Sequence, residues 1–149
     1  MTAKSKSNEI ILINGPNLNL LGKREVDLYG QKGLEDIVKD LKEKALAHEK
    51  KIVDFQSNHE GEIVDFIQSV IKKKEQPRGI IINPGAFSHT SIAIRDALLA
   101  TDLPIVEVHI TNIFKRESFR KHSYISDIAS GVISGLGTDG YQAALFYFL

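Results

Sequence analysis

Short apolar runs alternate with amphipathic helical segments along the whole 149-residue chain. The first run, residues 9–13 (EIILI), ends at Asn14-Gly15-Pro16, which is typical of a buried parallel strand. The apolar residues that follow recur at helical spacing over residues 33–49. The same patterns predict strands at 9–13, 51–56, 79–82, 104–110 and 131–134, helices at 33–49, 62–74, 91–100 and 140–149, and one or two helical turns at 116–121.

This alternation indicates a single α/β domain over residues 9–149, built on a parallel sheet. Because crossovers are right-handed, few topologies remain. We expect a flavodoxin-like three-layer sandwich whose five-stranded parallel sheet has the order 2-1-3-4-5. Residues 1–8 are polar and are expected to form a disordered tail. The longest connection, residues 16–32, has the length of a lid or a binding loop.

Composition excludes several classes of protein. The chain has no cysteine, which removes disulfides, Cys-ligated zinc, iron–sulfur clusters and a cysteine nucleophile. Its 19 basic and 19 acidic residues balance, which argues against nucleic-acid binding and against a polybasic membrane protein. No run approaches the ~18 apolar residues of a membrane helix, and residues 1–8 lack the apolar stretch of a secretory signal. We therefore expect a soluble, cytoplasmic protein.

Two glycine-rich segments resemble nucleotide-binding motifs without meeting their requirements. Residues 135–140 match G-x-G-x-x-G, but neither a βαβ unit nor an acidic residue about 20 positions on follows them. We interpret these glycines as a tight turn and a close helix contact. Gly15, Gly22 and Lys23 miss the spacing of a phosphate loop, and Arg24 stands where Ser or Thr belongs. The histidines also lack metal-ligand spacing.

Polar side chains follow four of the predicted strands, at the sheet edge where open α/β domains bind ligands. They are Asn14, Asn17, Ser57, Asn58, His59, Asn83, His89, His109, Thr111, Asn112, Arg116 and Arg120. Turn chemistry explains any one of the asparagines, but their convergence on one edge favours a polar pocket.

Glu107 and His109 are two positions apart on a predicted strand, so both side chains point to the same face. A carboxylate beside an imidazole fixes its tautomer and favours its charged form, which makes His109 a candidate general acid. The alternative is a structural histidine, and metal ligation lacks a third ligand. Arg116 and Arg120 are four apart and are expected to share a helical face, where they would hold a small anion or hydroxyls.

Arg24 and Tyr29 are the reactive candidates in the long loop. A free tyrosine has a pKa of about 10 and is a poor base at neutral pH. A guanidinium nearby favours tyrosinate, so Arg24 is a candidate activator of a Tyr29 base. The alternative is that Tyr29 anchors the loop as an aromatic side chain.

Seven segments together resemble the type II 3-dehydroquinases. They are INGPNL (13–18), REVDLYG (24–30), QSNHEG (56–61), NPGAFSHTS (83–91), EVHITN (107–112), FRKHSY (119–124) and GVISGLGTDGY (131–141). The resemblance implies dehydration of 3-dehydroquinate to 3-dehydroshikimate, in the shikimate pathway of aromatic amino-acid biosynthesis or in quinate catabolism. It implies anti elimination through an enol or enolate, with no cofactor, metal or Schiff-base lysine, in a dodecamer built as a tetramer of trimers.

The resemblance also implies roles for individual residues. Tyr29 would take the C2 proton with Arg24 lowering its pKa, and His109, oriented by Glu107, would protonate the departing C1 hydroxyl. Asn17 would hold a water that stabilises the enolate. Substrate binding would fall to Asn83 with the Ile110 and Thr111 backbone (carboxylate and C1 group), His89 and Arg120 (ring hydroxyls), Arg116 (near Tyr29) and Asp96 (in a neighbouring subunit's site).

Two positions depart from the family pattern. Thr111 stands where the family usually has Ser, and the hydroxyl is kept. Val26 stands where Pro is frequent, which would loosen the loop without changing the chemistry.

Two other classes of protein stay open from the sequence. One is a non-catalytic flavodoxin-like binding module, such as a flavin carrier or a phosphoacceptor; the latter needs an acidic cluster where this chain has Asn and His. The other is an inactive homologue, against which the reactive set argues: Arg24, Tyr29, His89, His109 and Arg120.

Overall fold

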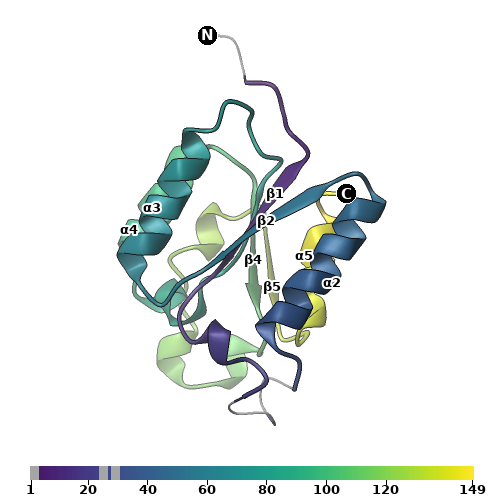
Figure 1. Ribbon diagram of the computed structural model, residues 1–149. Helices are drawn as coiled ribbons and strands as arrows, with labels where there is room; N and C mark the ends of the chain where they lie inside the picture. Colours follow the sequence, from purple (N-terminus) through teal and green to yellow (C-terminus); the bar gives the residue numbers. More distant parts are fainter. Residues whose placement is uncertain (1–3, 24–26, 28–30) are drawn as a thin grey trace.

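The computed structural model describes residues 4–23, 27 and 31–149. Its centre is a parallel sheet of β1 (Glu9–Asn14), β2 (Lys51–Gln56), β3 (Ile80–Asn83), β4 (Ile105–His109) and β5 (Gly131–Ser134). The strand order is β2-β1-β3-β4-β5. Figure 1 shows α3 (Glu60–Ile71) and α4 (Ile92–Thr101) on one face, and α2 (Leu34–Ala47) and α5 (Asp139–Phe146) on the other. The predicted three-layer fold and strand order are therefore confirmed.

The sheet separates two apolar cores, which explains why its central strands are continuously hydrophobic. Within β1, Ile10 and Leu12 pack toward α2 and α5, whereas Ile11 and Ile13 pack toward α3 and α4. All four side chains are fully buried. Because burying one such side chain contributes about 1.5–3 kcal/mol, neither face of β1 tolerates a polar residue between Ile10 and Ile13.

The helix α3 begins two residues earlier than predicted and ends before the Lys72-Lys73-Lys74 run. Its last turn is closed by Lys4, whose Nζ donates to the carbonyl oxygens of Ile71 and Lys73 at 2.8 and 2.9 Å. Cations suit the carbonyl end of a helix. The helix end is therefore fixed by a contact that lies far away in the sequence.

The segment before β1 differs from the expected disordered tail over its described residues. Lys6 forms an isolated parallel bridge with Gln76. The Ser7 N–H donates to the Gln76 carbonyl at 2.9 Å, and the Gln76 N–H donates to the Ser5 carbonyl at 2.8 Å. These backbone bonds hold residues 5–7 against the connection between α3 and β3.

The carboxyl edge of the sheet carries short 3-10 turns instead of longer helices. They are Leu18–Leu20, Gly85–His89, Ile113–Lys115, Ser118–Arg120 and Ser126–Ile128. The expectation that Arg116 and Arg120 share a helical face was wrong, because Arg116 is extended, with φ −101° and ψ −163°, and separates two turns. Asn112 begins the Ile113–Lys115 turn, where its side-chain oxygen accepts the Phe114 N–H at 3.0 Å.

The glycines of residues 135–140 form a turn and a helix contact, as interpreted from the sequence. Gly135 and Gly137 have φ of +95° and +62°, in the left-handed region that favours glycine. A Cβ on Gly140 would lie 3.3 Å from Ile133 Cγ2 and 3.4 Å from Val108 Cγ1. The segment thus brings α5 close to β4 and β5. Among the described residues, no helix is long and apolar enough to cross a membrane.

Candidate active site

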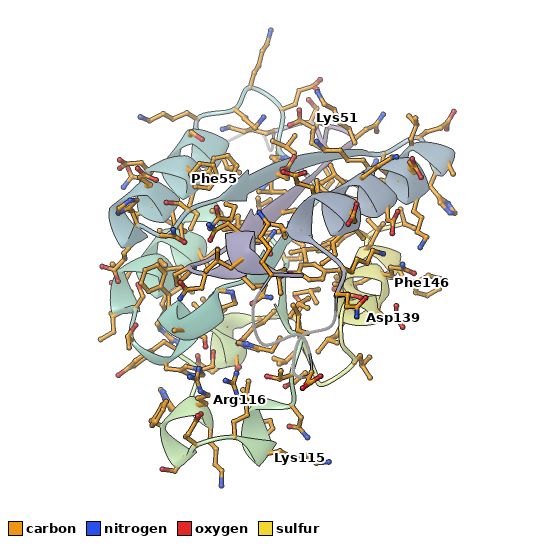
Figure 2. The ribbon with its side chains drawn as sticks, turned by 60° about the horizontal axis from the view of Figure 1, so that its bottom comes forward. Lys51, Phe55, Lys115, Arg116, Asp139 and Phe146 are labelled. Atoms are coloured by element: carbon orange, nitrogen blue, oxygen red, sulfur yellow. The ribbon has the colours of Figure 1, made fainter. Side chains whose placement is uncertain are left out.

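A cavity of about 160 Å³ opens at the carboxyl edge of the sheet, a size that fits a small molecule. The described residues that line it are Pro16, Asn17, Leu18, Leu21, Asn83, Gly85, Ala86, His89, His109, Ile110, Thr111, Ile113, Arg116 and Arg120. Figure 2 brings this edge forward, with Arg116 on the inner side of the 3-10 segments and Lys115 pointing away. No Asp or Glu is among these lining residues, and two guanidinium groups, those of Arg116 and Arg120, reach the cavity.

A buried carboxylate–imidazole pair lies at the end of β4. Glu107 is 0% exposed and His109 is 5% exposed. His109 Nε2 is hydrogen-bonded to Glu107 Oε2, which agrees with two side chains on one face of a strand. Glu107 also accepts the Ser123 hydroxyl on Oε2 at 2.9 Å and the Ser126 hydroxyl on Oε1 at 2.6 Å.

These hydrogen bonds control the charge of Glu107. Burial alone raises the pKa of the Glu107 carboxyl, but the bonds from His109, Ser126 and Ser123 outweigh it and hold the pKa below its usual value. The carboxylate is therefore ionised at neutral pH and holds one imidazole nitrogen. The other ring nitrogen of His109 is the one that can face a ligand.

His89 lies beside His109 in the cavity, with ring centroids 6.4 Å apart and planes inclined by 16°. Its Nδ1 lies 2.7 Å from the His122 carbonyl oxygen, which fixes the ring. Burial lowers the pKa of His89, and the hydrogen bond to His122 offsets this only in part. His89 therefore lies in the cavity as a neutral hydrogen-bonding group.

Asn17 lies in the left-handed region, with φ of +68°, where asparagine is tolerated better than most residues. Its N–H donates to Asn58 Oδ1 at 2.9 Å, and Gln56 Nε2 donates to the same oxygen at 3.2 Å. Asn58, in the connection after β2, therefore positions Asn17 without lining the cavity itself.

Ser57 and His59 do not line the cavity either. The Ser57 hydroxyl donates to Glu62 Oε2 at 2.5 Å and accepts the His59 N–H at 2.9 Å, at the start of α3. For the residues after β2, turn and helix-start chemistry is thus the correct explanation.

The basic groups enter the cavity from the 3-10 segments after β4. Arg116 Nη1 donates to the Thr111 hydroxyl at 3.4 Å, so the hydroxyl kept at Thr111 contacts a guanidinium. Arg120 Nε donates to Glu117 Oε2 at 2.5 Å. Although they do not share a helical face, both arginines reach one cavity, as expected for an anion site.

The comparisons with known proteins agree on one family. Residues 8–149 match the family model described as dehydroquinase class II. The chain belongs to this family. A 3-dehydroquinate dehydratase of Polynucleobacter asymbioticus is 57% identical over 141 residues, covering 95% of this chain and 93% of the relative. A catabolic 3-dehydroquinase of Penicillium rubens is 54% identical over 136 residues, covering 91% of this chain and 86% of the relative.

Solved structures of the same family share the fold. The type II dehydroquinase of Propionibacterium acnes superposes with a TM-score of 0.88 at 38% identity and covers 96% of this chain and 97% of its own. That of Butyrivibrio crossotus has a TM-score of 0.89 at 42% identity, with 94% and 96% covered. These similarities confirm the family resemblance and the enzyme class that it implies, the hydro-lyases.

The cavity collects eight of the residues to which the dehydroquinase resemblance assigns a role. They are Asn17, Asn83, His89, His109, Ile110, Thr111, Arg116 and Arg120, with Glu107 directly behind His109. Asp96 lies elsewhere, exposed on α4. Arg24, Val26 and Tyr29 lie outside the described residues. The roles of Tyr29 as the base and of Arg24 as its activator therefore remain predictions.

Three described residues around the cavity were not predicted from the sequence. Ser123 and Ser126 hold Glu107 from 16 and 19 positions away. Tyr141 is fully buried on α5, and its hydroxyl contacts Asn83. The signal for Tyr141 was a tyrosine on the inner face of the last helix, because a buried phenol hydroxyl needs a hydrogen-bond partner. No local sequence pattern predicts that the two serines contact Glu107.

Gly15→Ala is expected to lower the free energy of unfolding by about 1–3 kcal/mol or more, because it overpacks a backbone contact. A Cβ on Gly15 would lie 2.2 Å from the Pro84 carbonyl oxygen. Gly61→Ala is the control, since nothing lies within 4 Å of a Cβ there and alanine favours the helix by up to about 1 kcal/mol. Urea unfolding measures both, and a Gly15→Ala protein as stable as the wild type would contradict the close approach.

Proposed function

We propose that this chain dehydrates 3-dehydroquinate to 3-dehydroshikimate by anti elimination of water through an enol or enolate. One observation carries the proposal: the cavity combines two guanidinium groups and a buried Glu107–His109 pair, without a carboxylate among its described lining residues. Such a lining suits a small carboxylate that must accept a proton on a leaving group. It offers no acidic cluster of the kind a phosphoacceptor needs.

The elimination divides into two proton transfers. A base takes the C2 proton, and the C–H electron pair forms the C2–C3 double bond of an enolate whose charge lies on the C3 oxygen. The enolate then returns its electrons, the C1–C2 double bond forms, and the C1–O bond breaks. His109 gives its proton to the departing oxygen, which leaves as water, while the ionised Glu107 holds the imidazole ring in place.

The remaining roles follow the family resemblance. Tyr29 is the base and Arg24 lowers its pKa, while Asn17 holds a water against the enolate oxygen. Asn83 and the backbone of Ile110 and Thr111 bind the carboxylate and the C1 group. His89 and Arg120 bind the ring hydroxyls, and Arg116 lies near Tyr29. Fixed dipoles of this kind stabilise a developing oxyanion best in a site that excludes water.

The assembly and setting are part of the proposal. The chain would form a dodecamer, a tetramer of trimers, in which Asp96 reaches a neighbouring subunit's site from its exposed position on α4. Residues 9–149 would act as a single domain in the cytoplasm. The reaction would serve aromatic amino-acid biosynthesis or quinate catabolism.

Incubation with 3-dehydroquinate tests the reaction. We expect the ultraviolet absorbance of a conjugated enone carboxylate to rise with time, and neither a chelator nor borohydride to stop it. If a folded, purified sample produces no absorbance, the proposed function is wrong.

Arg120→Ala is expected to raise KM about tenfold, because the loss of one charge-assisted hydrogen bond to substrate costs roughly 1.5 kcal/mol or more. Lys121→Ala is the matched control, since Lys121 is exposed and is not among the lining residues. Steady-state kinetics compare the two variants. Equal KM values would remove Arg120 from the binding site.

A further inference from the structure

A buried hydroxyl joins the ends of two neighbouring strands behind the cavity. Tyr141 on α5 is 0% exposed, and its hydroxyl donates to Asn14 Oδ1 at 2.6 Å and accepts from Asn83 Nδ2 at 2.9 Å. Asn14 and Asn83 end β1 and β3 and face each other in the register. Asn83 lines the cavity, whereas Asn14 and Tyr141 are not among its lining residues.

The single proton of the hydroxyl gives these bonds a direction. An asparagine carbonyl oxygen only accepts, so Tyr141 donates its proton to Asn14 and offers Asn83 a lone pair. Asn83 therefore presents Nδ2 to Tyr141. Its Oδ1 accepts the Gly85 N–H at 3.1 Å, which requires the same orientation from the opposite side of the amide.

The orientation of this amide decides what Asn83 can offer a ligand. An amide nitrogen carries two hydrogens, and one of them is used on Tyr141, so the second is left as a donor. A flipped amide would present a carbonyl oxygen in its place, and two oxygens repel where a carboxylate must bind. Burial also raises the pKa of Tyr141, so the hydroxyl keeps its proton across the range in which enzymes work.

We propose that Tyr141 is a positioning residue for substrate binding: held by Asn14, it locks the Asn83 amide as a hydrogen-bond donor to the substrate carboxylate. The inference rests on the proposed function, in which Asn83 binds that carboxylate. The inference predicts that Tyr141 affects KM and takes no part in proton transfer, because its hydroxyl lies behind Asn83 and does not line the cavity.

Tyr141→Phe tests the lock, because it removes the hydroxyl and keeps the ring that packs in the core. We expect KM to rise about fivefold to tenfold, the weight of one hydrogen bond, and kcat to change by less than about twofold. Tyr147→Phe is the matched control, since Tyr147 follows α5 and is 58% exposed, and its KM should equal that of the wild type. An unchanged KM in a folded Tyr141→Phe protein would overturn the proposal.

A double mutant separates positioning from packing. In an Asn83→Ala background, Tyr141→Phe should raise KM no further, because the group it positions is gone. Equal increases in both backgrounds would show a purely structural role and overturn the proposal.

Asn14→Leu gives a second route to the same result, should Tyr141→Phe fail to fold. Leucine is similar in size and removes the acceptor that directs the Tyr141 proton, so KM should rise as in Tyr141→Phe. Because Asn14 does not line the cavity, an effect on KM must pass through Tyr141. A folded Asn14→Leu protein with the wild-type KM would count against the lock.

Hydrogen exchange of the Asn83 side-chain amide, followed by NMR, does not depend on turnover. We expect a slowly exchanging hydrogen in the wild type and exchange about tenfold faster in Tyr141→Phe, as one hydrogen bond is lost. Equal exchange rates would overturn the lock. If the wild type has no turnover but shows this difference, the proposed function fails and the lock stands.

Discussion

Replacing His109 by alanine is expected to lower kcat for 3-dehydroquinate by about 10²–10⁴-fold, the usual contribution of a general acid. The reason is that the C1 hydroxyl leaves as hydroxide when no proton is supplied. Glu107 cannot take over, because its pKa is held low and it lies fully buried behind the histidine. The measurement is initial-rate absorbance at saturating substrate.

Two comparisons make the His109 result specific. His48→Ala is the control, since His48 is exposed where α2 ends and should leave kcat unchanged. His109→Ala keeps both serine hydroxyls on Glu107, so we expect it to fold with a stability loss of only about 1–3 kcal/mol. If the folded variant kept more than about a tenth of the wild-type kcat, the acid would have to be another group.

The strands were predictable from the sequence because they are buried on both faces. Residues 51–56 and 131–134 match their predicted bounds, and the other strands differ by one residue at one or both ends. The segment between residues 113 and 128 was predicted less well. Its 3-10 turns depend on side chains such as Asn112 and Ser123 bonding to nearby backbone N–H groups, and these local bonds compete with a regular helix.

The candidate site was predictable where one rule places a residue directly, and unpredictable where a partner is distant. The rule that ligands bind beyond strand ends found Asn83, His109 and Thr111. It also suggested Ser57, whose hydroxyl instead bonds to Glu62 and to the His59 N–H at the start of α3. Tyr141 meets Asn14 across 127 positions and Asn83 across 58, and no local pattern encodes such a contact.

The balanced charge of the chain argues against nucleic-acid and membrane partners, but it does not predict the charge of a small ligand. Lys and Arg equal Asp and Glu in number over the whole sequence, yet the described lining of the cavity includes Arg116 and Arg120 and no carboxylate. Of the acidic groups described nearby, Glu107 is shielded behind His109 and bonded to it, and Glu117 is paired with Arg120. Net charge sums over a surface, whereas a site depends on which charges the fold brings together.

Glu107→Gln is expected to lower the free energy of unfolding by about 3 kcal/mol at neutral pH, because it breaks one partner of a buried, hydrogen-bonded pair. The carboxylate accepts from His109, Ser123 and Ser126. A glutamine has an NH₂ group in place of one oxygen, so at least one of these donors would face another donor. We also expect kcat to fall, since His109 loses the carboxylate that holds its ring.

The pH dependence of this loss has a defined sign. The pKa of Glu107 in the folded protein lies below its usual value of 4.5, so the unfolded chain binds the proton more readily. A depressed carboxyl pKa stabilises the fold above the unfolded pKa, and this contribution is lost as the pH falls through the folded pKa. The stability gap between wild type and Glu107→Gln should therefore be complete at pH 7 and narrow below about pH 4.

Urea unfolding of both proteins across this pH range measures the gap, with Glu43→Gln as the control because Glu43 is exposed on α2. The control should be as stable as the wild type at every pH, since an exposed carboxyl without a buried partner gains little on folding. A gap that stayed constant down to acid pH would mean that Glu107 is already protonated in the folded protein. In that case Glu107 would be a neutral hydrogen-bond partner that only orients the His109 ring, and the expected role of its negative charge would be wrong.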